Sequence, residues 1–460
     1  MINKRITLVL ILFSILLLPV SIFIVPENGN FKLDNKDDYH NQQLVPFTSN
    51  TIVEKWNFTT SQDVNHLAIS DDGKYVCAVI GNNITLFNND NNNTLLNYEM
   101  NSPITSMDLS SKGDYIAVGD ENGNVTLFNC TSFDDKVLEW SYKTDDFIKS
   151  VAISPDGKYI VAGDKYSLKS EGYIYFFNNS NTDPKNYEWR YDILSEITSI
   201  DIGYDKTDDI YYIVAGNDYS NGMVYYFNNT NEDLKKEMWI YETVGPVNEV
   251  DMSLDGNYFT VHCSENDNLY TFNKSSSESQ PPMGFFHGVR KDDLAISPEG
   301  GYITVGNVQE DMTYLFDNLL NEPIWKAESG NSVNSVDISL YGNYILAGSV
   351  DNHMYLYHKS SNNSIWSYDS GAEVRLVALS LTGNYIAGVS SDGSNINTIY
   401  LFYHDIPNPL GNPELSDNGD SSNNSESNNA IPFGNYHLLF ISIGIIGLIV
   451  INKRKTLKIN

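Results

Sequence analysis

Residues 364–374 read SIWSYDSGAEV, and the spacing inside this stretch recurs along the chain. Here a tryptophan is followed two residues later by a tyrosine, and eight residues later by a valine that opens an apolar run. All six tryptophans of the 460-residue chain have a valine or isoleucine at the eighth position: Trp56 and Val64, Trp140 and Ile148, Trp189 and Ile197, Trp239 and Val247, Trp325 and Val333, Trp366 and Val374. A residue type confined to one position of a recurring unit indicates a repeat architecture.

Each of these apolar runs opens a copy of one longer pattern. Residues 148–178 are a clear copy: IKSVAISPDGKYIVAGD, a short insertion, and then GYIYFFN. The pattern contains three short strand-like runs joined by turn residues, and the tryptophan run supplies a fourth. The eight copies begin at Val64, Ile104, Ile148, Ile197, Val247, Lys291, Val333 and Val374, and those at Ile197, Val247 and Lys291 are the weaker ones.

Four short strands in a unit of roughly 40 to 50 residues are typical of a β-propeller blade. Residues two apart on a strand share a face, so the Trp-x-aromatic pairs predict a packing wedge in the outer strand of each blade. The pattern weakens to Leu96 and Tyr98, to Met283 and Phe285, and to Trp325 and Ala327 in three copies.

The order of the strands predicts how the ring closes. A tryptophan strand at residues 54–58 precedes the first inner strand, and none follows the last strand at 399–404. The first outer strand would then complete the last blade and leave no open sheet edge. We predict an all-β, eight-bladed β-propeller over residues 51–404 with this velcro closure; a seven-bladed ring with one stray unit is the alternative.

The net charge of the chain limits its partners, and its cysteines limit the disulfide and zinc sites that it can form. The chain has 59 acidic and 28 basic residues and a formal net charge of −31, a field that repels phosphate backbones and argues against nucleic acid. Cys77, Cys130 and Cys263 lie far apart with no CxxC pair, which predicts neither a disulfide framework nor a zinc site. One bridge stays open as an alternative, although a buried free thiol is expected at Cys77.

Both ends predict contact with a membrane. Residues 6–25 are an apolar run behind Lys4 and Arg5, so residues 1–25 are expected to be a signal peptide or a retained signal anchor, followed by a polar spacer at 26–50. A Pro-, Ser- and Asn-rich stalk at 405–434 leads to an apolar segment with a basic tail at 435–460, and both segments are expected to form hydrophobic helices. The propeller would then lie outside the cell, anchored at its surface.

The tail resembles archaeal C-terminal sorting signals, in its order of polar stalk, short motif, apolar span and basic end. The short motif here is Ile431-Pro432-Phe433-Gly434, in place of the Pro-Gly-Phe order of that family. The resemblance implies trimming and re-anchoring on an archaeal cell surface. A plain C-terminal membrane anchor is the alternative.

Acidic residues recur at the fifth position of the innermost strand, where other copies have alanine. Four carboxylates near one axis predict either a metal or ligand site or hydrogen bonds to the backbone of the same or the adjoining blade, and we favour the hydrogen bonds. The axial metal candidates are Asp108, Asp201, Asp251 and Asp337.

Asn-x-Ser/Thr motifs recur in the turn before the tryptophan strand, which is expected on the solvent rim. The glycosylation candidates are Asn92, Asn129, Asn178, Asn228, Asn273 and Asn362. The histidines show no metal-binding spacing and no GxSxG motif occurs, so nothing indicates hydrolytic catalysis.

The copies, above all SPDGKYIVAGD at residues 154–164, resemble WD40 and PQQ-type quinoprotein-like repeats over about 350 residues. The Gly-His and Trp-Asp dipeptides of WD40 repeats are absent; Leu127-Phe128-Asn129 stands where Trp-Asp would end a strand. The quinoprotein resemblance implies PQQ stacked on a tryptophan above a calcium ion, often beside a vicinal disulfide, and the chain has no adjacent cysteines.

These features favour a non-catalytic, surface-anchored propeller that serves as a scaffold for a protein or glycan partner. No cofactor is expected. The alternative is an extracellular enzyme of quinoprotein or lyase type that uses the axial aspartates.

Overall fold

The computed structural model describes residues 51–132, 137–165, 172–180, 186–193, 195–229, 237–265, 267–276, 282–288, 291–318, 322–394 and 396–406. Within these ranges the chain forms β-strands, one 3-10 turn at Leu340–Gly342 and no α-helix. The described part contains no helix that is long and apolar enough to cross a membrane. The predicted segments 1–25, 26–50 and 435–460 lie outside the described residues, as does the stalk beyond residue 406.

The strands fall into eight groups of four, which we call blades 1 to 8. Blades 1 to 4 contain β2 (Val64–Ile69), β3 (Tyr75–Ile80), β4 (Asn83–Asn88) and β5 (Thr94–Glu99); β6 (Ile104–Leu109), β7 (Tyr115–Asp120), β8 (Asn124–Asn129) and β9 (Leu138–Lys143); β10 (Ile148–Ile153), β11 (Tyr159–Asp164), β12 (Gly172–Asn178) and β13 (Trp189–Ile193); β14 (Ile197–Asp205), β15 (Ile210–Asn217), β16 (Met223–Asn228) and β17 (Trp239–Glu242). Blades 5 to 8 contain β18 (Val247–Met252), β19 (Tyr258–Cys263), β20 (Asn268–Asn273) and β21 (Gly284–His287); β22 (Lys291–Ile296), β23 (Tyr302–Asn307), β24 (Met312–Asp317) and β25 (Pro323–Glu328); β26 (Val333–Ile338), β27 (Tyr344–Ser349), β28 (His353–His358) and β29 (Ser364–Asp369); β30 (Glu373–Leu379), β31 (Tyr385–Ser391), β32 (Asn397–His404) and β1 (Ile52–Thr60).

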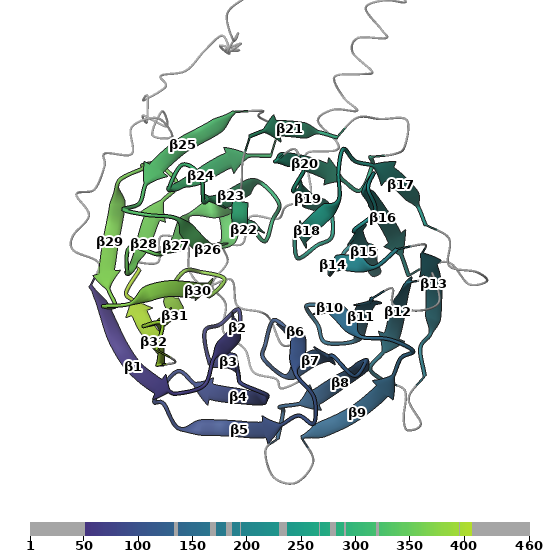
Figure 1. The fold of residues 1–460 in the computed structure, drawn as a ribbon, viewed down its shortest axis with the longest axis horizontal. Coiled ribbons are helices and arrows are strands. Elements are labelled where there is room, and N and C mark those ends of the chain that lie inside the picture. Colours follow the sequence, from purple (N-terminus) through teal and green to yellow (C-terminus); the bar gives the residue numbers. More distant parts are fainter. Residues whose placement is uncertain are drawn as a thin grey trace, which may run out of the picture. The chain divides into compact units, whose positions relative to one another are not determined.

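Each blade is one antiparallel sheet, and the blades surround a central axis with the first strand of each innermost (Figure 1). Blade 8 has the order β1-β32-β31-β30, so the first strand of the chain is the outer strand of the last blade. Its register pairs Ile52 with His404 and Trp56 with Leu401. The prediction of eight blades with this closure is confirmed, and the seven-bladed alternative is wrong.

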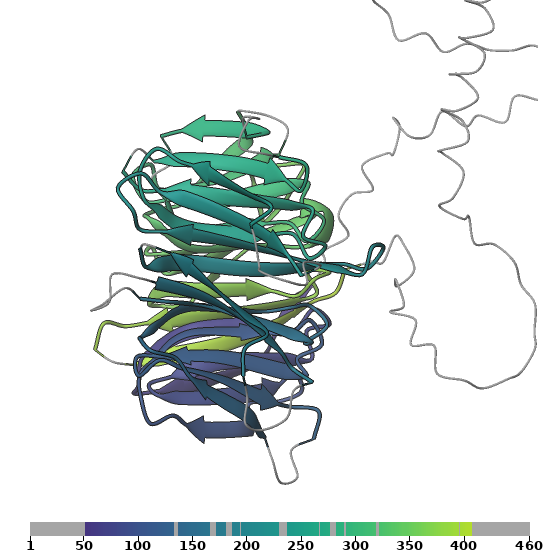
Figure 2. The same ribbon diagram turned by 90° about the vertical axis from the view of Figure 1, so that its right-hand side faces the viewer.

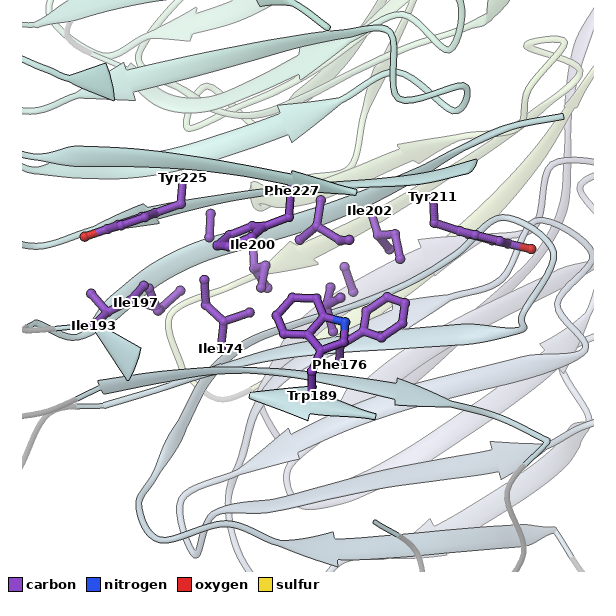
Figure 3. Close-up of a cluster of buried hydrophobic side chains, with 14 residues drawn as sticks. Ile174, Phe176, Trp189, Ile193, Ile197, Ile200, Ile202, Tyr211, Tyr225 and Phe227 are labelled. Carbon is purple, nitrogen blue, oxygen red and sulfur yellow. The ribbon is translucent and has the colours of Figure 1, made fainter. Parts of the chain in front are cut away.

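Aromatic side chains fill the space between adjacent blades. The tryptophan of one outer strand lies against an aromatic residue near the end of the third strand of the next blade, as for Trp140 and Phe177 at 5.4 Å between ring centroids. Tyr142, two residues on, reaches the same Phe177 at 5.2 Å. Figure 3 shows the equivalent cluster between blades 3 and 4, where Trp189 lies against Phe227. Because these rings are buried or half-buried, they supply much of the apolar packing that joins neighbouring sheets.

Blade 5 departs from the predicted outer-strand pattern. The sequence pattern placed Met283 and Phe285 in the tryptophan and tyrosine positions, but the register pairs Thr271 with Gly284 and Leu269 with Phe286. Phe286 packs on Phe316 of blade 6 at 5.0 Å, whereas Phe285 is 44% exposed. The predicted pair was wrong by one residue, and a one-residue slip in a strand moves each side chain to the other face.

A recurring turn joins the first and second strands of the blades. In blade 3, Ser154 Oγ accepts the N–H of Tyr159 at 3.0 Å and donates to Asp156 at 2.8 Å. Gly157 has a φ of +73°, and a Cβ there would lie 2.5 Å from the ring of Tyr115 in blade 2. The glycine is therefore needed both for the turn and for the approach of the neighbouring blade.

The three cysteines are buried and unpaired. Cys77 lies in the second strand of blade 1, as expected for a small apolar residue in a core. The alternative of a disulfide bridge is wrong for this structure.

Candidate functional site

The four axial aspartates lie at the fifth position of the innermost strands β6, β14, β18 and β26, in blades 2, 4, 5 and 7. In each, one carboxylate oxygen accepts the N–H of the next residue in the same strand, at 2.7 to 3.0 Å. The other oxygen accepts an N–H from the innermost strand of the following blade, at 2.6 to 2.8 Å. Asp251, for example, joins Met252 of its own blade to Ile296 of blade 6.

This geometry contains the hydrogen bonds that we favoured for the aspartates. Both oxygens of each carboxylate accept backbone N–H groups, so the side chains connect neighbouring blades, as the hydrogen-bond interpretation predicts. Among the residues that the structure describes, no group of three or more His, Cys, Asp or Glu side chains is arranged to hold a metal ion. The aspartates of the innermost strands thus hydrogen-bond neighbouring blades to each other, at Asp108, Asp201, Asp251 and Asp337.

Burial raises the pKa of these four aspartates. It raises the pKa of Asp108 to about 6, and the pKa of both Asp251 and Asp337 to about 7, against the opposing effect of the backbone N–H donors. The pKa of Asp201 is raised well above its ordinary value of 3.8, first by burial and then by the neighbouring carboxylate of Asp251. These side chains are only half-buried, so contact with water lessens the desolvation that raises their pKa.

These raised values predict a pH-dependent stability. Between about pH 4 and pH 7 the folded chain holds more protons on these aspartates than the unfolded chain, so the free energy of unfolding falls as pH rises through that window. We expect the melting temperature of the full-length protein to be higher at pH 5 than at pH 7.5, by about 2 °C or more. Asp251→Asn should flatten this slope. Asp392→Asn is the control, because backbone donors lower the pKa of that exposed carboxylate and take it out of the window; equal slopes in the two variants would contradict the assignment.

Two further sets of inter-blade contacts were missed by the sequence reasoning. Serine recurs at the third position of the innermost strand, and Ser106 Oγ of blade 2 accepts the N–H of Val151 of blade 3 at 3.0 Å. Ser150, Ser199 and Ser335 accept the equivalent N–H groups. The repeated serine was the available signal.

The second set is a series of backbone hydrogen bonds between the turns that join first and second strands in neighbouring blades. Asp71 N–H of blade 1 donates to Ser111 O of blade 2, and Leu381 N–H of blade 8 donates to Asp71 O, at 2.8 and 3.0 Å. The equivalent donor position is Pro155 in blade 3 and Pro298 in blade 6, and proline has no N–H to donate. The pattern therefore links blade 8 to blade 1 by the same contact that links other neighbours.

The loops on the two faces of the ring differ in charge. One face, which we call the acidic face, carries the loops between second and third strands and the connections from an outer strand to the next blade; Figure 2 shows the two faces edge-on. The acids in these described loops are Asp63, Glu121, Asp145, Asp146, Glu196, Asp218, Glu265, Asp267, Glu310, Asp311, Asp351 and Asp392, and none is buried. The single base in the same described loops is Lys165.

The opposite face is mixed in sign. Its described loops carry Lys74, Lys112, Lys158, Lys206, Lys274 and Lys359 among their acids. The two ends of the described chain also meet on this face, where Asp405 N–H donates to Thr51 O at 3.4 Å. The described loops of the acidic face therefore carry charge of almost one sign, and neither end of the described chain lies on this face.

The glycosylation candidates lie in the turns between third and outer strands, on the mixed face. Asn92 and Asn362 are exposed, while Asn129, Asn178, Asn228 and Asn273 end their strands and are half-buried. Asn178 Oδ1 accepts the N–H and the hydroxyl of Ser180 at 2.9 and 2.7 Å, and Asn129 binds Thr131 in the same way. The Asn-x-Ser/Thr pattern at these two sites therefore has a structural role, since it closes the turn.

Comparison with known proteins agrees with this geometry. Three segments match the family model WD40 (WD domain, G-beta repeat): residues 93–129, 136–177 and 322–358. Each segment covers an outer strand and three strands of the next blade, as β5 to β8 do. The chain is a β-propeller, and these three segments of it match WD40 repeats.

A solved structure described as "Structure of Dos1 propeller" resembles this propeller with a TM-score of 0.58 and 13% sequence identity, over 77% of this chain and 96% of that one. At that identity the likeness concerns the fold alone. No curated protein matches the chain in sequence. WD40 propellers are usually non-catalytic scaffolds for protein partners.

Proposed function

We propose that this WD40-repeat propeller is a non-catalytic scaffold that binds a basic protein through its acidic face. The observation that carries the proposal is the charge of the described loops on that face, with twelve acids and one base. Such a surface attracts a positively charged partner and raises its association rate. The alternative of an enzyme with axial carboxylates gains no support, because both oxygens of each axial aspartate accept backbone N–H groups.

We further propose that the propeller is displayed outside a cell membrane. The support is the sequence at both ends, where apolar runs stand beside Lys4 and Arg5 and beside the basic tail from Lys453. Since the described ends Thr51 and Asp405 meet on the mixed face, tethers attached there would leave the acidic face free.

The partner proposal is tested by reversing charges on one face at a time. We expect Asp63→Lys with Glu121→Lys and Asp145→Lys to slow association with partners from the cell envelope about tenfold at low salt. The matched control, Asp90→Lys with Asp208→Lys and Glu322→Lys, changes the same charge on the mixed face.

Envelope proteins captured by the full-length wild type are identified by mass spectrometry, and their association rates are measured against both triple variants. Partners with excess lysine and arginine that are lost only with the acidic-face variant would support the proposal. Equal capture by all three proteins, or capture of acidic partners, would contradict it.

The display proposal predicts which sequons carry glycans. Asn92 and Asn362 are exposed, so we expect them to be the most fully modified sites in protein isolated from its natural membrane. Asn178 should be modified less, because it is half-buried at the end of β12, whereas Asn92 and Asn362 stay exposed while their Nδ2 atoms donate to backbone oxygens. Peptide mapping by mass spectrometry measures each occupancy; unmodified Asn92 and Asn362 beside a modified Asn178 would refute this order.

A further inference from the structure

Two exposed apolar side chains lie in adjoining loops of the acidic face, where blades 4 and 5 meet. Tyr219, in the loop between β15 and β16, is 52% exposed, and Val244, in the connection from β17 to β18, is 59% exposed. The two loops are hydrogen-bonded to each other, since Gly222 N–H donates to Gly245 O at 3.1 Å and Thr243 N–H donates to Gly222 O at 2.8 Å. We call Tyr219, Val244 and their acidic neighbours the blade 4–5 corner.

The loops of this corner are held firmly in place. Thr243 Oγ1 donates to the carbonyl oxygens of both Gly222 and Gly245, at 2.9 Å each. Val244 N–H donates to the hydroxyl of Tyr270 in blade 5 at 3.4 Å. The exposed apolar side chains thus project from a backbone that is already ordered, which lowers the entropic cost of binding.

The fold does not require an apolar residue at position 244. The same turn occurs in blade 2 at Thr144, which donates to two carbonyl oxygens at 2.8 and 2.7 Å, and in blade 7 at Ser370, which donates at 3.0 and 2.7 Å. The residue that follows is Asp145 in blade 2 and Gly371 in blade 7. The exposed side chain of Val244 takes no part in the hydrogen bonds that hold the turn, so it is free to contact a partner.

Carboxylates lie in or beside the two loops that carry Tyr219 and Val244. Asp218 precedes Tyr219, Glu242 accepts a hydrogen bond from Asn221 at 2.7 Å, and a Cβ at Gly245 would lie 3.0 Å from Cβ of Glu265. The loops 218–222 and 243–246 contain no lysine or arginine. The corner therefore combines two exposed apolar side chains with neighbouring negative charge.

We propose that the blade 4–5 corner binds a lysine- or arginine-rich segment of a partner protein that carries one large apolar side chain, with that side chain packed on Tyr219 and Val244. Charge complementarity selects the basic segment, and burial of the apolar side chain fixes its position on the ring. This inference rests on the proposed function, and it adds where on the acidic face the partner is anchored.

The test uses the full-length protein and two labelled probes: an oligolysine peptide with one central tryptophan, and the same peptide with alanine at the centre. We expect the tryptophan peptide to bind wild type about tenfold more tightly than the alanine peptide. In Tyr219→Ser with Val244→Asp, the difference should fall below about twofold. The aspartate in that variant is the residue that blade 2 already has in the same turn, so folding should be retained.

Ile396→Ser is the matched control, because Ile396 is 49% exposed in a loop of the same face, on blade 8. It should keep the tenfold preference. Equal binding of the two peptides to wild type, with salt-sensitive affinity, would overturn the corner and leave the acidic face supported. A preference that survives Tyr219→Ser with Val244→Asp would also overturn the corner, and no binding of either peptide would overturn both proposals.

Discussion

Replacing Gly73 with alanine is expected to lower the free energy of unfolding by about 3 kcal/mol. Gly73 lies in the turn between β2 and β3 with a φ of +69°, a backbone conformation that strains alanine. Its added Cβ would lie 2.0 Å from the ring of Tyr385 in blade 8, far inside contact distance. The loss therefore combines backbone strain with a clash at the junction between the last and the first blade.

A second glycine separates these two contributions. Gly371 has a φ of +73°, but a Cβ there would meet nothing within 4 Å. Gly371→Ala should cost only the backbone strain, about 1 kcal/mol. The midpoints of urea denaturation of both variants measure the difference; equal losses would show that the approach of Tyr385 has no energetic weight.

Trp56→Ala is expected to destabilise the ring by about 4 kcal/mol, the usual cost of removing a large buried aromatic side chain. Trp56 is 7% exposed on β1, lies 5.3 Å from Phe87 of blade 1, and donates its indole N–H to Asn88 O at 3.2 Å. Its loss weakens the packing between blade 8, which β1 completes, and blade 1. Trp56 therefore joins the blade that closes the ring to the first blade.

Val53→Ala on the same strand is the control, because Val53 is 48% exposed and should change stability by about 0.5 kcal/mol or less. Calorimetric melting of the two variants provides the comparison. If Trp56→Ala and Val53→Ala melt at the same temperature, the tryptophan is not the wedge that its position indicates.

Most of the fold could be predicted because one pattern of strands and turns recurs in all eight copies. Each innermost strand except the last begins at the predicted residue, from Val64 in blade 1 to Val333 in blade 7. Strand alternation and turn glycines carry that information in the sequence itself. The register of the outer strand of blade 5 was predicted wrongly because Gly284 stands in the tryptophan position, and without the indole nothing in the sequence marks the register.

The candidate surface was harder to predict than the fold. The aspartates drew attention as a cluster, yet their partners are backbone N–H groups of the next blade, such as Ile296 for Asp251, which no side-chain motif reveals. The acidic face depends on which loops share a side of the ring. That sorting needs the closed topology, since Asp63 and Asp392 are far apart in the chain and belong to neighbouring blades.

The pairing of Ile52 with His404 has a mechanical consequence. β1 and β32 are antiparallel neighbours whose outer ends lie together, so a force that pulls the two ends of the described chain apart loads the first residue pair before the next. The strands would peel one pair at a time, as a zipper opens, instead of sliding along their whole length. The pairing of β1 with β32, which closes the ring, is therefore also the pairing that a pulling force would open first.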